Sequence, residues 1–211
     1  SEQVIDGRSN NWLAAVCAHK GRYGMAFIDA STGEFLLGEG DARQLAKLMD
    51  GHAPSELLYP REDRAGLATT LGHWRMQALD DWAFTDDFAR ERLLSWFGTS
   101  SLKGFGVEDL PLGQRAAGAI LHYLGETRHD RMAHVRRIAR ITADDAVHLD
   151  RFTVRNLELV SPVNEGGATL LSAMDTCRTP MGARLLRRWL LFPLVSGADI
   201  LDRSGRVAEF V

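Results

Sequence analysis

Three short apolar runs open the chain, at residues 11–19, 22–29 and 34–39. Each has the length of a buried strand, and turn-forming residues such as Lys20-Gly21 separate them. Parallel neighbours need a long crossover, so runs this close in sequence must pair antiparallel. The pattern therefore predicts three antiparallel strands at the start of the chain.

Beyond residue 40 the spacing of apolar positions changes. The expected elements are a helix at 41–50 capped by Asp41, a strand at 56–59, a helix at 61–71, a strand at 75–79, a helix starting at Thr85, and a helix at 112–124 ended by Gly125. Three antiparallel strands followed by alternating helix and strand is the order of an RNase H-like sheet. The fold class predicted for this part is α/β with a mixed sheet.

From Ile141 onward the pattern is mostly helical. Asp150 predicts the cap of a helix that runs to about residue 159. Thr179-Pro180 is a strong helix start, because Thr is a good N-cap and Pro fits the first helical position. Pro193 is expected to end that helix.

The charge is uneven and indicates two units. Residues 1–125 hold 12 Lys and Arg against 17 Asp and Glu, whereas residues 126–211 hold 13 against 11. The shift predicts two units with a junction near residue 130, and we interpret 128–140 as a basic linker between them. The arginines of this linker are Arg128, Arg131, Arg136, Arg137 and Arg140. They indicate either a solvated linker or a contact with phosphate.

Composition limits the function classes. A 45% hydrophobic, 25% charged chain of net charge −3 is typical of a globular protein and is not basic enough for a dedicated nucleic-acid-binding domain. The only two cysteines, Cys17 and Cys177, lie far apart in sequence and show neither a disulfide framework nor zinc-ligand spacing, which suits a reducing cytoplasm. No apolar run reaches the ~20 residues of a membrane helix, and no signal peptide is visible. The chain starts with Ser1 and stops within the amphipathic segment 206–211, so we expect a fragment of a longer protein.

The chain contains no motif for catalysis or cofactor binding. It has no P-loop, no nucleophile elbow and no histidine pair at ligand spacing. A nuclease with an RNase H-like sheet needs an acid within its first strand, but the stretch 12–17 has none. We therefore predict no catalytic, cofactor-binding or metal-binding residue.

One helix face remains as a candidate interaction surface. On the helix after Thr85, Asp87, Glu91 and Ser95 recur every four residues, opposite the apolar stripe, and Arg90 and Arg92 flank them. Such a face is either an ordinary solvated surface or a docking surface for a partner.

Several segments of the chain together form a recognisable pattern: YGMAFIDASTGEF at 23–35, PSELL at 54–58, LKGFG at 102–106, AAG at 116–118, Leu149-Asp150, TVRNLEL at 153–159, TPMGARLLRRWL at 179–190 and Pro193-Leu194. They resemble the MutS family of bacterial DNA mismatch-repair proteins. They follow the family's order along essentially the whole chain.

The resemblance implies that residues 1–127 are the connector domain, which is RNase H-like without nuclease acids, and that 141–211 begin the core domain. Members are dimeric mismatch-recognition ATPases. The mismatch-reading domain, the DNA clamp and the domain that binds ATP and Mg²⁺ are missing here, so the fragment is expected to be non-catalytic. The implied partners are MutL, the other domains, a second subunit and, through the missing domains, mismatched DNA; no membrane is implied.

The resemblance also assigns residues. The region of Asp87, Arg90, Glu91, Arg92 and Ser95 matches the expected MutL docking region.

In the second unit, the resemblance makes Arg155, Asn156 and Glu158 structural residues of the first core helices. Pro180 and Gly182 set the start of the next helix. The alternatives are a metal-dependent RNase H-like nuclease and a non-specific DNA-binding module that uses the arginine-rich linker.

Overall fold

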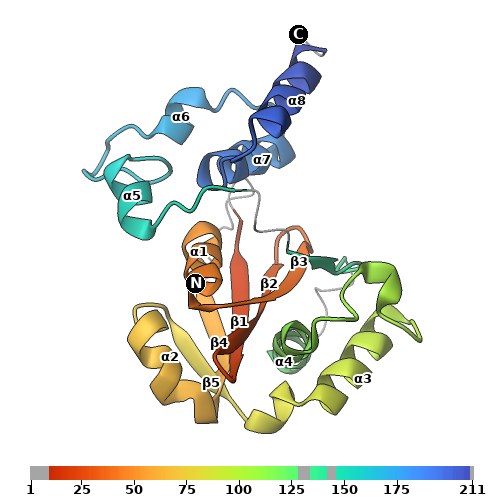
Figure 1. Cartoon of the computed structure of the whole chain (residues 1–211). Helices are drawn as coiled ribbons and strands as arrows, with labels where there is room; N and C mark the ends of the chain where they lie inside the picture. Colours follow the sequence, from red (N-terminus) through yellow and green to blue (C-terminus); the bar gives the residue numbers. More distant parts are fainter. Residues whose placement is uncertain (1–9, 128–133, 142–145, 210–211) are drawn as a thin grey trace. The chain divides into compact units, whose positions relative to one another are not determined.

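The computed structural model describes residues 10–127, 134–141 and 146–209, which belong to two compact units (Figure 1). The first unit contains residues 10–141 and the second continues from there to the end of the chain. Each unit is described by itself. In the described part of the chain, no helix combines the length and apolarity required to cross a membrane.

A six-stranded mixed sheet forms the centre of the first unit, in the order β5-β4-β1-β2-β3-β6. Its strands are β1 Trp12–His19, β2 Arg22–Asp29, β3 Phe35–Gly40, β4 Glu56–Pro60, β5 Met76–Leu79 and β6 Ala139–Arg140. The strands β1, β2 and β3 pair antiparallel, whereas β4 joins β1, β5 joins β4 and β6 joins β3 in parallel. The predicted antiparallel start and mixed α/β sheet are confirmed.

Helices lie on both sides of this sheet (Figure 1). They are α1 Ala42–His52, α2 Arg64–Leu71, α3 Asp86–Phe97 and α4 Pro111–Thr127, with short 3₁₀ turns η1 Arg61–Asp63, η2 Asp81–Phe84 and η3 Lys103–Phe105. Alternation along β2 separates the two faces. Ala26 and Ile28 join the core that includes α4, whereas Phe27 stacks on His52 of α1 with ring centroids 4.4 Å apart.

The position of α4 depends on contacts distant in sequence. The Oε1 atom of Glu39 on β3 accepts a hydrogen bond from the backbone N–H of Leu112 at 2.7 Å, which places a carboxylate at the helix N-terminus. Gly24 lies directly against the backbone of Leu112, so a Cβ there would clash. Gly118 lets α3 and α4 approach, since a Cβ there would lie 2.6 Å from the Cα of Ala89. Gly125 was expected to end this helix but lies inside it, buried.

The expected linker at 128–140 is wrong in its second half. Residues 134–141 belong to the first unit, where Ala139 and Arg140 pair with β3 as an edge strand. Val135 and Ile138 are only 4% and 1% exposed and join the core of the sheet. These two buried side chains anchor the segment to the sheet, although its arginines stay exposed. Arg128 and Arg131 lie outside the described residues.

The second unit is helical, as predicted. Its helices are α5 Arg151–Asn156, α6 Leu170–Met174, α7 Pro180–Leu191 and α8 Gly197–Ala208, and a single bridge pairs Ala146 with Leu194. Helix α5 ends before the predicted residue 159, because Glu158 adopts a φ of +48° that a helix does not allow. Thr179 caps α7 and Pro180 is its first residue, as expected.

Candidate functional site

The charged face predicted on α3 is exposed to solvent. Asp87, Glu91 and Ser95 all lie on the open side of the helix, opposite the buried Ala89 and Leu93. We call these three residues the α3 face. Two acids in its first turn, Asp86 and Asp87, stabilise this helix because they lie at the positive end of its dipole.

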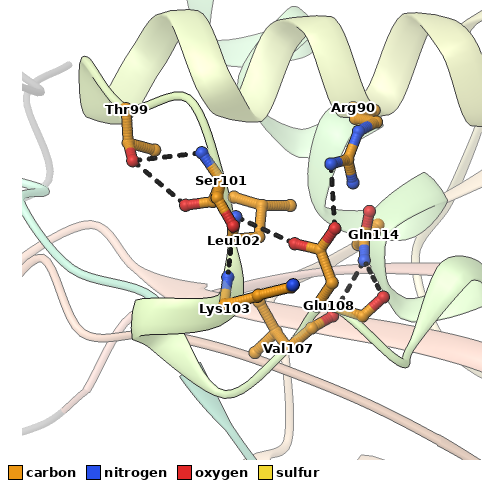
Figure 2. Close-up of polar contacts among 8 residues, drawn as sticks. All are labelled: Arg90, Thr99, Ser101, Leu102, Lys103, Val107, Glu108 and Gln114. Carbon is orange, nitrogen blue, oxygen red and sulfur yellow. Dashed lines mark hydrogen bonds and ion pairs between the residues drawn. The ribbon is translucent and has the colours of Figure 1, made fainter.

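Arg90 is exposed but engaged, because it ties α3 to the loop that follows (Figure 2). Its Nη2 atom lies 2.8 Å from Oε1 of Glu108. The other carboxylate oxygen of Glu108 accepts the backbone N–H of Leu102 at 2.9 Å. The hydrogen bond from Arg90 lowers the pKa of the Glu108 carboxyl. Arg90 therefore shapes the loop beside the α3 face.

The same loop is held by further side chains at both of its ends (Figure 2). The hydroxyl of Thr99 donates to the carbonyl of Ser101 at 3.0 Å, and the Ser101 hydroxyl accepts the N–H of Lys103 at 3.2 Å. The amide of Gln114 donates to the carbonyls of Val107 and Glu108 at 2.8 and 3.2 Å. These hydrogen bonds hold the loop next to α3 in a single conformation.

Arg92 is placed differently from the prediction, which set it at the margin of the exposed face. Its side chain is half-buried between α3 and α4, where Nη2 donates to the carbonyl of Leu121 at 3.4 Å. The guanidinium occupies the space that a side chain at Gly125 would need, and its Nε is buried without a partner in the structure. Position 92 follows Ala89 by three residues, so it shares the α4 side of the helix. Arg92 is an internal contact.

A hollow of about 370 Å³ lies at the N-terminal end of α3. Two of its carboxylates already have partners within the protein. Asp63 accepts a hydrogen bond from the N–H of Ala18 at 2.7 Å, and Asp86 accepts two hydrogen bonds from the Arg115 guanidinium at 2.6 and 2.7 Å. Burial raises the pKa of the Cys17 thiol to about 12, so it stays protonated. Among the described residues, no three His, Cys, Asp or Glu side chains are grouped to hold a metal ion.

In the second unit, the polar residues singled out have unequal roles. Glu158 holds the turn after α5, where its Oε1 accepts the N–H of Val163 at 2.8 Å. The N–H of Gly182 donates to the Thr179 hydroxyl at 3.1 Å, which completes the start of α7 next to Pro180. Arg155 and Asn156 are exposed on α5.

Comparison with known proteins agrees with the two units. Residues 11–136 match MutS domain II, and residues 152–211 match MutS domain III. The chain belongs to the MutS family. The domain II match ends just before β6, so the last strand of the first unit's sheet lies outside it.

Similar bacterial proteins cover the whole chain. It is 46% identical over 211 residues to the DNA mismatch repair protein MutS of Bacteroides fragilis. It is 43% identical over 212 residues to that of Porphyromonas gingivalis and 42% identical over 211 residues to that of Flavobacterium psychrophilum. In each case the match takes up all of this chain but only 24% of the relative.

Proposed function

We propose that this chain is the connector and the opening part of the core of a MutS protein that acts in DNA mismatch repair. Mismatch recognition and ATP hydrolysis then belong to other parts of that protein, together with its second subunit. This is supported by the matches to domains II and III and by their extent, 24% of the relatives' length. We place the end of the connector at Ile141, because β6 completes its sheet.

The proposed role is mechanical and not catalytic. The order β5-β4-β1-β2-β3, with β1 to β3 antiparallel, supports an RNase H-like fold. β1 carries no acid. Of the nearby carboxylates, Asp63 accepts a backbone hydrogen bond and Asp86 pairs with Arg115, so neither is available as a ligand for a catalytic metal ion. A rigid sheet domain without a reactive group suits the transmission of motion between neighbouring domains.

The α3 face is the proposed docking surface for MutL. The observation that supports it is the exposure of Asp87, Glu91 and Ser95 on a helix that Arg92 joins to α4 and Arg90 joins to the following loop. Docking interfaces favour rigid surfaces, because less conformational entropy is lost on binding. Arg92 supports this surface by joining α3 to α4 and is not proposed to contact MutL.

The test is equilibrium binding of the 211-residue chain to the ATPase half of MutL. Glu91→Lys reverses an exposed charge without touching the core, so the fold should persist. We expect it to weaken binding by about tenfold or more if Glu91 lies within the interface.

Glu165→Lys is the matched control, since it makes the same reversal at an exposed loop of the second unit. Equal binding by the two variants would place MutL docking elsewhere. Arg92→Gln tests the internal role: it should speed amide exchange in α3 and α4, whether or not MutL is present, because the contact with Leu121 is lost.

A further inference from the structure

The segment from His134 to Ile141 presents arginines from a fixed backbone. Val135 and Ile138 are buried, and Nε1 of Trp96 donates to the Val135 carbonyl at 3.2 Å. At its far end, the N–H of Ile141 donates to the carbonyl of Leu37 at 2.8 Å. The backbone between these anchors is therefore held against the sheet.

Arg136 and Arg137 lie between the buried Val135 and Ile138, and both arginines are exposed. In the described part of the chain neither has an ion-pair or hydrogen-bond partner for its side chain. Arg140, three residues on, differs because it pairs with Asp109 at 2.7 Å. The arginine pair, as we call Arg136 and Arg137, thus leaves two exposed guanidinium groups without a partner among the described residues.

We propose that the arginine pair is a contact site for the phosphate backbone of DNA. Guanidinium binds phosphate through two parallel hydrogen bonds, and each neutralised phosphate releases condensed counterions. The fixed backbone reduces the entropy lost when the site is occupied. The proposal rests on the proposed function, in which the whole protein works on DNA.

DNA suits this surface better than a protein partner does. The exposed side chains from 134 to 141 are three arginines and His134, whereas the apolar Val135 and Ile138 face inward. Protein interfaces are usually centred on large apolar or aromatic anchors, and no large apolar side chain of residues 134–141 falls among the exposed ones. A phosphate backbone needs only positive charge and donors.

The experiment measures binding of the 211-residue chain to a labelled DNA duplex by fluorescence anisotropy between about 50 and 200 mM NaCl. We compare the chain with the double variant Arg136→Gln, Arg137→Gln. Two lost phosphate contacts should reduce the slope of log affinity against log salt by about 2 and weaken binding roughly tenfold or more at low salt. Circular dichroism checks that the fold is kept.

The matched control is Arg43→Gln, Arg64→Gln, which removes the same charge from exposed positions on α1 and α2. It should leave the slope nearly unchanged. The proposal is overturned if the wild-type chain does not bind the duplex, or if both double variants change the slope equally. Retained DNA binding with loss of MutL binding would also overturn it and assign the pair to a protein interface. Glu91→Lys tests MutL docking separately, so the two ideas can fail independently.

Discussion

The two units keep their helices in place by different means. In the second unit, Asp150, Thr169, Thr179 and Ser196 each cap a helix with a side-chain hydrogen bond. In the first unit, Asp41 caps α1 in the same way, but the N-caps of α2 and α3 make no such bond, and the N-terminus of α4 is bound by Glu39 of β3. Among the described residues, three of the four helices of the first unit therefore depend on packing and distant contacts, whereas every helix of the second has a local side-chain cap.

Burial differs in the same direction. Nearly all buried apolar side chains of the described residues lie in the first unit, and only Leu159, Ala183 and Leu191 lie in the second. Where the structure describes the chain, all the exposed large hydrophobic side chains except Trp82 lie in the second unit. Amphipathic helices thus form there without burying their apolar stripes among themselves. We expect this unit to exchange its amide protons faster than the first.

The sharpest way to test this comparison is to truncate one large apolar side chain in each unit. Phe27→Ala removes a fully buried ring stacked on His52 and should cost about 3–5 kcal/mol of unfolding free energy. Leu185→Ala removes a side chain that is 46% exposed and should cost within about 0.5–1 kcal/mol. Hydrogen exchange resolved by segment measures both. Equal costs would contradict the contrast.

A buried acid in the first unit gives the second test. Asp29 accepts hydrogen bonds from the side chain and N–H of Ser31, at 2.6 and 2.9 Å, and from Asn10 and Asn11. Burial alone would raise the pKa of its carboxyl, but these hydrogen bonds lower it overall. Asp29→Asn should cost about 1–3 kcal/mol at neutral pH.

The pH dependence of this cost checks its cause. Because the folded pKa of Asp29 lies below its unfolded value of 3.8, its contribution is present above that value and is lost as pH falls through the folded pKa. The difference between Asp29→Asn and wild type should shrink on acidification. In the second unit, a bond from the Thr153 N–H lowers the pKa of Asp150, and Asp150→Asn should have a smaller effect because asparagine also caps helices. A difference that stays constant with pH would assign the Asp29 effect to packing.

The smallest expected effect concerns the caps. Thr179→Ala removes a hydroxyl that accepts the N–H of Gly182, and should destabilise α7 by about 1 kcal/mol. Thr85→Ala at the start of α3 should cost less, because the Thr85 hydroxyl donates to the carbonyl of Trp82 and accepts no helix N–H. Exchange rates in α7 and α3 give the comparison. A larger loss in α3 would mean that both units depend on local capping.

Much of the fold was predictable from the sequence. Strands at 11–19 and 22–29, the cap at Asp41 and the start at Thr179-Pro180 all follow from spacing and turn chemistry that act over a few residues. The exposed positions of Asp87, Glu91 and Ser95 follow from helical periodicity alone. These features depend on short-range sterics and hydrogen bonds, which the neighbouring residues determine.

Other features were decided only by the tertiary structure. Residues 134–141 join the sheet because Val135 and Ile138 are buried in its core, although β3 lies about a hundred residues earlier in the chain. The spacing of these two apolar residues within a basic stretch was the signal available in the sequence. The internal place of Arg92 depends on Gly125 of another helix. Short-range pattern selects the helices and strands of this protein. Which charged side chains are buried, paired or free is decided by packing between residues far apart in the chain.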